Sequence, residues 1–228
     1  MNMKNKEKIV KKALLIIPAV LIVTGLLLFL PAGTIYYWQA WAFMAVLFMP
    51  FFFVASYFLK KDPKFLERRL RYKEKEASQK KVIRLSWIVF FIALLVPGLD
   101  FRFGWSGVPA WLVILADIFV FLGYAIIFLV FKENSYASRI VEVEKGQKVI
   151  STGPYSMVRH PMYLGTIMMY LFMPIALGSY VALLIFAPMI FGILFFRIRD
   201  EEKLLLKELN GYKAYCRKVK YRLVPGVW

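Results

Sequence analysis

Residues 109–131 read PAWLVILADIFVFLGYAIIFLVF, and Asp117 is the single charged side chain among them. At about 1.5 Å of rise per residue, a helix of this length crosses the roughly 30 Å hydrocarbon core of a bilayer. The other long stretches of this apolar character are 13–31, 39–59, 82–99, 162–177 and 179–196. The pattern predicts an all-α integral membrane protein with about six transmembrane helices.

The last two apolar stretches are short and almost adjacent, since only residues 177–180 separate them. We therefore expect a tight helical hairpin that barely reaches the far leaflet. Asp117 is the one acid well inside an apolar stretch. A carboxylate in hydrocarbon is costly and is a functional candidate by default, although a protonated or hydrogen-bonded Asp117 that only packs is an equally open interpretation.

The net charge of +17 is distributed by loop. Five lysines precede the first apolar stretch, ten Lys/Arg lie in 60–81, five in 132–160 and nine in 197–228, whereas residues 31–38 have no charge. This alternation is the positive-inside pattern and places both termini in the cytoplasm. The excess of basic residues therefore indicates the orientation of the chain in the membrane and an attraction to the lipid bilayer, rather than nucleic-acid binding.

Polar residues become frequent after Phe131. We therefore expect residues 1–131 to form a transmembrane scaffold of four spans with a basic cytoplasmic loop, and residues 132–228 to form the catalytic region. Residues 60–81 predict either a surface helix that begins at Pro63 or a solvated loop. One histidine and one cysteine in the whole chain make a metal site unexpected.

The single histidine, His160, lies in residues 153–165, GPYSMVRHPMYLG. Proline is favoured at the first position of a helix, so Pro161 predicts a helix that begins directly after His160. The N-terminus of a helix attracts anionic groups. Gly165 would let another helix or a ligand approach closely.

A second polar cluster, Arg197 with Glu201 and Glu202, follows the last apolar stretch. Arg197 and Glu201 are four residues apart and share a helix face. An interfacial Arg–Glu pair is more often a solvated structural feature than a site. Because a hairpin would bring this cluster beside His160, however, the sequence predicts one cytoplasmic pocket at the membrane boundary.

The motifs of this half of the chain are Gly153-Pro-Tyr-x3-Arg-His-Pro-x-Tyr-x-Gly165, a short hairpin, Arg197, Glu201-Glu202 and Gly211-x3-Tyr215. Together they resemble the isoprenylcysteine carboxyl methyltransferase family. That family is related to phospholipid N-methyltransferases. The resemblance implies an S-adenosylmethionine pocket lined by Gln147, Lys148, Val149, Ile150, Tyr155, His160, Pro161, Met162, Tyr163, Glu201 and Glu202. It implies catalytic roles for Arg197, Glu201 and His160.

The resemblance implies methyl transfer to a lipid-like or prenylated acceptor, for which a carboxylate that becomes a methyl ester is our first expectation. A carboxylate needs no base, whereas an amine acceptor would need a glutamate or His160 to keep it neutral. A phospholipid or amine N-methyltransferase, an NADPH-dependent sterol-type reductase and a non-catalytic membrane protein or transporter are the alternatives. We expect a monomer in the inner membrane of a bacterium or an archaeon.

Overall fold

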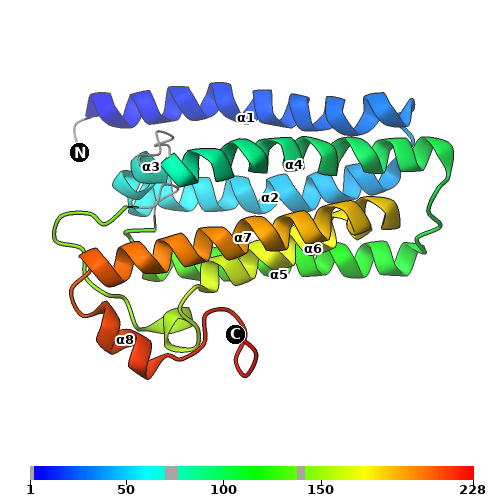
Figure 1. Cartoon of the computed structure of the whole chain (residues 1–228). Helices are drawn as coiled ribbons and strands as arrows, with labels where there is room; N and C mark the ends of the chain where they lie inside the picture. The colour runs from blue at the N-terminus through cyan, green and yellow to red at the C-terminus, as the bar shows by residue number, and fades with distance from the viewer. Residues whose placement is uncertain (1–2, 70–76, 138–141) are drawn as a thin grey trace.

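A computed structural model describes residues 3–69, 77–137 and 142–228 of the chain. The long helices form an antiparallel bundle, and short helices gather near one end of it (Figure 1). In chain order the helices are α1 (Met3–Ala32), α2 (Trp38–Lys61), α3 (Pro63–Arg69), α4 (Ala77–Phe103), α5 (Ala110–Glu133), the 3-10 helix η1 (Gly153–Ser156), α6 (Pro161–Ala176), α7 (Tyr180–Glu208) and α8 (Tyr212–Lys218).

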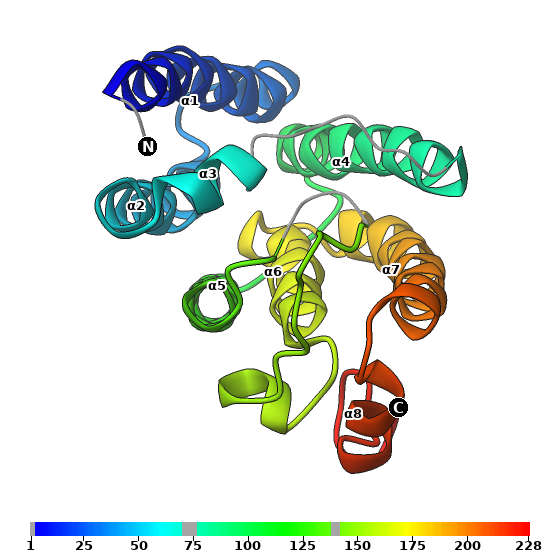
Figure 2. The same cartoon turned by 90° about the vertical axis from the view of Figure 1, so that its left-hand side faces the viewer.

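Seen along the bundle, α1 and α4 form one side, and α6 lies between α5 and α7 on the other (Figure 2). Among the described residues, four helices are long and apolar enough to cross a membrane, namely α2, α4, α5 and α7. The helical segments Ile16–Ala32 and Pro161–Ala176 are apolar but shorter. The chain is thus an all-α, multi-pass membrane protein. The six apolar stretches lie in α1, α2, α4, α5, α6 and α7, and four of these helices are full candidate spans among the described residues, so the prediction of about six transmembrane helices is confirmed in part.

The helical hairpin differs from the predicted one because its two arms are unequal. Helix α6 has 16 residues, whereas α7 has 29 and continues well past the end of its apolar stretch. No proline or glycine interrupts residues 193–208, so the polar sequence remains helical. The extension carries Arg197, Glu201 and Glu202 on one rigid helix instead of on a flexible tail.

Helices α5 and α6 approach each other most closely at a pair of glycines. A Cβ atom at position 165 would lie 2.7 Å from the carbonyl oxygen of Gly123 and 2.9 Å from Cγ1 of Ile127. A Cβ at position 123 would lie 2.7 Å from the carbonyl oxygen of Gly165. Lipid tails are as apolar as the helices, so close packing of this kind drives helix association in membranes. The partner that Gly165 admits is therefore a helix.

We expect Gly165→Ala to lower the thermal unfolding temperature of the detergent-solubilised protein, because the new methyl group must push two backbones apart at a cost of about 1–3 kcal/mol. Gly192→Ala in α7 is the matched control, since a Cβ there meets nothing within 4 Å. That control should be neutral or slightly stabilising, because alanine is the better helix former. Equal melting temperatures for the two variants would contradict this account of the α5–α6 contact.

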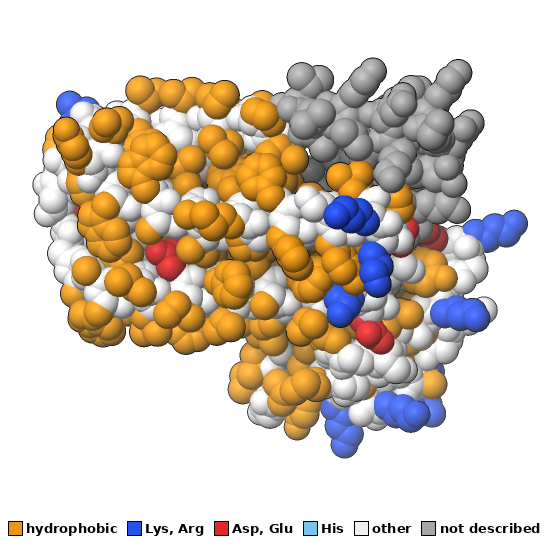
Figure 3. Space-filling view, turned by 180° about the vertical axis from the view of Figure 1, so that it is seen from behind, with side chains coloured by type: hydrophobic (Ala, Val, Ile, Leu, Met, Phe, Trp, Pro, Cys, Tyr) orange, Lys and Arg blue, Asp and Glu red, His pale blue; other side chains and the backbone are white. Residues whose placement is uncertain are grey.

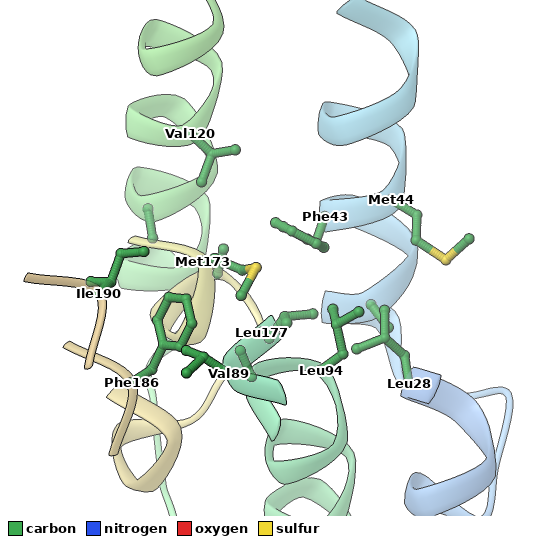
Figure 4. Packing of buried hydrophobic residues seen from close by; sticks show 14 of the residues in the cluster. Leu28, Phe43, Met44, Val89, Leu94, Val120, Met173, Leu177, Phe186 and Ile190 are labelled. Atoms are coloured by element: carbon green, nitrogen blue, oxygen red, sulfur yellow. The ribbon is translucent and has the colours of Figure 1, made fainter. Parts of the chain in front are cut away.

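The main apolar core joins helices from both halves of the chain. Met173 of α6 and Leu177, the residue directly after α6, point into it, among Phe43 of α2, Leu94 of α4 and Phe186 of α7 (Figure 4). Met173 is 2% exposed and Leu177 is 1% exposed. Helix α6 is therefore held in place on several sides, which positions its first turn.

A buried carboxylate holds the far end of the hairpin. Asp100 near the end of α4 accepts hydrogen bonds from the backbone N–H of Ser106 at 2.7 Å and from its hydroxyl at 2.6 Å. It also accepts one from the hydroxyl of Ser179, whose oxygen caps α7 by accepting from the N–H of Ala182 at 2.9 Å. The α6–α7 turn is thereby joined to α4, so the hairpin is anchored opposite the polar end of α7.

The short helix α3 begins at Pro63, which agrees with the helical alternative for residues 60–81 and not with a solvated loop at this point. Phe65 is 1% exposed and packs on Phe58 and Phe131, so α3 is attached to the bundle by a buried aromatic contact. Residues 70–76 of the predicted surface helix lie outside the described residues. The contact joins α3 to the end of α5 at which the polar half of the chain begins.

Candidate functional site

A cavity lies at the end of the bundle where α5 finishes and α6 begins, which we call the pocket end. Its empty volume is about 870 Å3, including its opening to solvent. Its walls come from the loop between α5 and α6, the first turn of α6, the polar turns of α7, and α8. The cavity therefore forms where the extension of α7 leaves the apolar bundle.

All of the predicted site residues except Pro161 and Glu202 line this cavity. The lining residues predicted from the sequence are Gln147, Lys148, Val149, Ile150, Tyr155, His160, Met162, Tyr163, Arg197 and Glu201. The structure thus brings the His160 motif and the α7 cluster together, as a hairpin requires. Their binding and catalytic roles remain predictions.

His160 occupies the N-cap position of α6, with Pro161 as the first helical residue. The imidazole is 4% exposed, and its Nε2 lies 3.3 Å from Oε1 of Glu202. The backbone N–H of His160 donates to the carbonyl oxygen of Arg222 at 2.9 Å. The ring is therefore held from both sides, and its Nε2 is directed at protein rather than at solvent.

Glu202 is the centre of a buried ion cluster and does not line the cavity. Its Oε1 accepts from Nε of Arg159 at 2.7 Å, and its Oε2 accepts from Nε of Arg222 at 2.6 Å. Arg159 also donates from Nη1 to the carbonyl oxygens of Val219 at 2.9 Å and Lys220 at 2.7 Å. Burial of an acid is tolerated here because cations and hydrogen bonds surround it. The cluster ties α7, the start of α6 and the end of α8 together.

A chain of three polar side chains crosses the hairpin at the cavity wall. Arg197 donates from Nε to the hydroxyl of Tyr163 at 3.1 Å, and that hydroxyl donates to Oε2 of Glu201 at 2.5 Å. Arg197 and Glu201 lie one helical turn apart on α7, and Tyr163 reaches them from α6. The wall thus presents a cation, a phenol and a carboxylate in a fixed order.

Tyr155 forms the opposite wall, on η1. Its hydroxyl accepts from Nδ2 of Asn134 at 2.9 Å, and its backbone carbonyl accepts from the hydroxyl of Tyr215 at 2.7 Å. Burial raises the pKa of Tyr155 to about 12, and the hydrogen bond from Asn134 opposes this only in part. The phenol therefore remains protonated at neutral pH and has its own proton to donate.

The loop segment 144–150 is a tight turn supported by a side chain. Gln147 accepts from the N–H of Glu144 through Oε1 at 2.9 Å, and its own N–H donates to the carbonyl oxygen of Glu144 at 3.0 Å. Gly146 has φ +79°, a conformation that glycine adopts without strain. The turn directs Lys148, Val149 and Ile150 along the cavity.

Several lining residues were not assigned a role from the sequence. They are Asn134, Tyr136, Ala137, Glu142, Arg159, Leu204, Leu205, Leu209, Tyr212 and Tyr215. The spacing Gly211-x3-Tyr215 was the one signal for the two α8 tyrosines, and Arg159 adjoins His160 in the motif. Leu204, Leu205 and Leu209 belong to an amphipathic tail that the sequence allows either to cover the pocket or to lie on the membrane surface, and the structure places it against the cavity. The remainder face the cavity because of tertiary packing.

Asp117 lies in the bundle and is not part of the cavity wall. Its side chain is on α5 and is 7% exposed. Its Oδ1 has no hydrogen-bond partner among the described residues. The carboxyl group is therefore separate from the candidate site.

The fold and the cavity define a class of multi-pass helical membrane proteins with a polar cavity at one end of the helix bundle. Residues 112–207 match the model of the isoprenylcysteine carboxyl methyltransferase (ICMT) family. A solved structure of the eukaryotic intramembrane Ras methyltransferase ICMT superposes with a TM-score of 0.56 and 20% sequence identity, over 90% of this chain and 74% of that one. Residues 112–207 are therefore similar to the ICMT family, and the superposition shows a shared fold.

Two curated relatives are sterol reductases. A Delta(14)-sterol reductase of Mus musculus is 28% identical over 155 residues, which is 63% of this chain and 37% of that protein. A Delta(14)-sterol reductase of Schizosaccharomyces pombe is 31% identical over 94 residues, which is 40% of this chain and 22% of that protein. The chain thus spans a minor part of the length of these relatives, with which it shares a membrane domain.

Proposed function

We propose that this chain is a membrane methyltransferase that takes its methyl group from S-adenosylmethionine and passes it to a lipid-like or prenylated carboxylate. The observation that carries the proposal is the ordered wall Arg197–Tyr163–Glu201 between the membrane helices and the polar cavity. This wall offers a carboxylate for a cationic donor and a guanidinium for an anionic acceptor. The match to the ICMT family model supports the same chemistry.

The residues of the cavity suit the proposed donor, which supplies an electrophilic methyl group on a positively charged sulfur. A carboxylate attracts such a cation, and tyrosine faces add a cation–π attraction. Glu201 and Glu142 supply carboxylates, and Tyr155, Tyr163 and Tyr212 supply rings. Lys148, Val149 and Ile150, which follow the 144–147 turn, line the cavity, and their main-chain groups suit the hydrogen bonds that a nucleoside requires.

A carboxylate acceptor fits the site better than an amine. An amine must be deprotonated by a base, yet the Nε2 of His160 is directed at Glu202, and Glu201 already accepts a hydrogen bond from the hydroxyl of Tyr163. A carboxylate is ionised at neutral pH and needs only to be placed. Arg197 can pair with it, since guanidinium–carboxylate hydrogen bonds are among the strong ones. The roles of these residues are then to position and neutralise rather than to transfer protons.

The match to sterol reductases makes NADPH-dependent reduction the second candidate. A phosphorylated dinucleotide requires cations for its phosphate groups. Among the described residues, the cations that line the cavity are Lys148, Arg159 and Arg197, of which Arg159 is already bound to Glu202 and two carbonyl oxygens. This charge distribution favours a donor with a positive centre over a polyanionic one.

We expect the purified protein in lipid nanodiscs to transfer labelled methyl groups from S-adenosylmethionine to a component of a membrane lipid extract. A base-labile product would identify a methyl ester, because esters hydrolyse in mild alkali and N-methyl groups do not. The measurement is the label that alkali releases as volatile methanol, because alkali also deacylates phospholipids and would move an N-methylated head group into water without making it volatile. Label that alkali does not release would identify the methyl acceptor as an amine and not as a carboxylate. Tight binding of NADPH, with no binding of S-adenosylmethionine, would establish the reductase alternative instead.

A further inference from the structure

Three apolar side chains of the 221–228 loop lie on the outside of the molecule and belong to neither the buried core nor the cavity lining. Val227 is 80% exposed, Val224 is 43% exposed and Tyr221 is 40% exposed. None of the three lines the cavity. Exposed apolar groups in a cluster mark a surface that meets an apolar partner.

The loop is a closed and well-anchored turn. The main-chain oxygen of Trp228 accepts from the N–H groups of Arg222 at 2.9 Å, Leu223 at 3.0 Å and Val224 at 3.3 Å. Leu223 is 5% exposed in the main core, and Gly226 has φ +81° at the tip. The apolar tip is therefore presented by a turn whose base is fixed to the bundle.

The position of the loop matches the boundary between hydrocarbon and headgroups. The ring of Trp228 stacks on Phe195 of α7, with centroids 5.7 Å apart. Phe195 and Phe196 are 44% and 58% exposed, and they are the last apolar residues of α7 before Arg197. The loop lies along the flank of the bundle, set back from the end of α7 (Figure 1). Seen from behind, hydrophobic side chains cover part of the lower protrusion and the bundle beside it (Figure 3).

The residues around the loop are cationic. Residues 209–228 contain five Lys/Arg and no Asp or Glu. Arg217, Lys218 and Lys220, which directly precede the loop, are exposed, whereas Lys213 lies one turn farther back at the start of α8. Basic residues next to a membrane surface are attracted by anionic lipids, and apolar side chains beside them insert below the headgroups.

We propose that the 221–228 loop is a membrane wedge whose tip, Val224 to Val227, inserts into an anionic leaflet at the pocket end while the neighbouring cations bind lipid phosphates. The partner is the anionic lipid surface itself, and the inference does not depend on methyl transfer. The wedge is also joined to the cavity, since the N–H of Arg159 donates to the carbonyl oxygen of Tyr221 and that of His160 to Arg222, both at 2.9 Å.

The single cysteine makes a depth measurement direct. In a Cys216→Ser background, a nitroxide is placed at Val227→Cys, with Leu184→Cys on the exposed face of α7 as the lipid reference and Lys213→Cys on α8 as the water reference. Collisions with oxygen and with a water-soluble nickel chelate are compared in nanodiscs of phosphatidylcholine with and without phosphatidylglycerol. We expect the oxygen-to-nickel collision ratio at position 227 to exceed that at 213 by at least about threefold with phosphatidylglycerol and by less without it.

A ratio at position 227 equal to that at 213 in both lipid mixtures would overturn the wedge. A high ratio at position 227 that does not change with phosphatidylglycerol would show that the loop inserts without a preference for anionic lipid, and would contradict the proposed partner. If Cys216→Ser does not fold, Val227→p-benzoylphenylalanine in the otherwise unchanged chain serves the same purpose. Irradiation should then attach phosphatidylglycerol to the protein, and the Lys213 equivalent should remain unlabelled. Labelling of both or of neither would contradict the proposal.

Discussion

Glu201→Gln should weaken the binding of S-adenosylmethionine by about tenfold to a hundredfold, because it removes the charge that faces a cationic donor. The neutral amide oxygen can still accept the hydrogen bond from Tyr163, so the hairpin should keep its geometry. Isothermal titration of the nanodisc-embedded protein measures the dissociation constant. The expected loss is electrostatic and should appear without a change in melting temperature.

Glu208→Gln is the matched control for that experiment. Glu208 ends the same helix, is exposed, and does not line the cavity. The Glu208→Gln substitution removes the same charge from α7 at a distance from the site. The variant should therefore bind S-adenosylmethionine with the same dissociation constant as the unchanged chain. An affinity for Glu201→Gln within twofold of the control would remove Glu201 from the donor site.

Glu202→Ala should destabilise the protein by about 3–5 kcal/mol, because it leaves buried cationic groups without their carboxylate. Arg159 and Glu202 have side-chain exposures of only 9% and 7%, so solvent screens this pair poorly, whereas Arg222, at 38%, can turn to water. For a chain of this size the loss corresponds to a fall of about 10 °C in melting temperature. Intrinsic tryptophan fluorescence during heating in detergent measures it.

A double-mutant cycle separates this ion cluster from a general loss of packing. Arg159→Met removes the positive charge next to Glu202 and keeps an apolar side chain of similar reach. If the destabilisation comes from unpaired charge, Arg159→Met combined with Glu202→Ala should lose less stability than the sum of the two single changes. Additive losses would show that the cluster contributes through packing alone. Glu201→Gln, one residue away, should melt within about 2 °C of the unchanged chain.

The sequence predicted the local structure around the site because that structure depends on short-range rules. Proline at a first helical position placed His160 at the N-cap of α6. The four-residue spacing of Arg197 and Glu201 placed both on one face of α7, and the structure has them bound to the same tyrosine. The hairpin connection was short enough to bring the two motifs to one end of the bundle.

The directions in which neighbouring side chains point could not be predicted from the sequence. Glu201 and Glu202 differ by one residue, which turns the side chain by about 100° around the helix axis. Their order along the chain does not say which one faces the cavity, and the sequence prediction placed both there. In the structure Arg159, His160 and Arg222 surround Glu202 on the other face. The shared helix face of Arg197 and Glu201 requires the helix to continue beyond its apolar stretch, and in the structure α7 continues to Glu208.

By itself the amino-acid sequence determined that the chain crosses a membrane as apolar helices and where α6 begins, because hydrophobic runs and proline act within a few residues of their own position. Tertiary structure alone decided that Glu202 becomes a buried anchor while Glu201 faces a cavity, and that the tyrosines of α8 close that cavity. Those outcomes depend on contacts between segments 40 to 60 residues apart, such as Arg159 with Glu202 and Tyr155 with Tyr215. Such contacts form only when the whole bundle has packed.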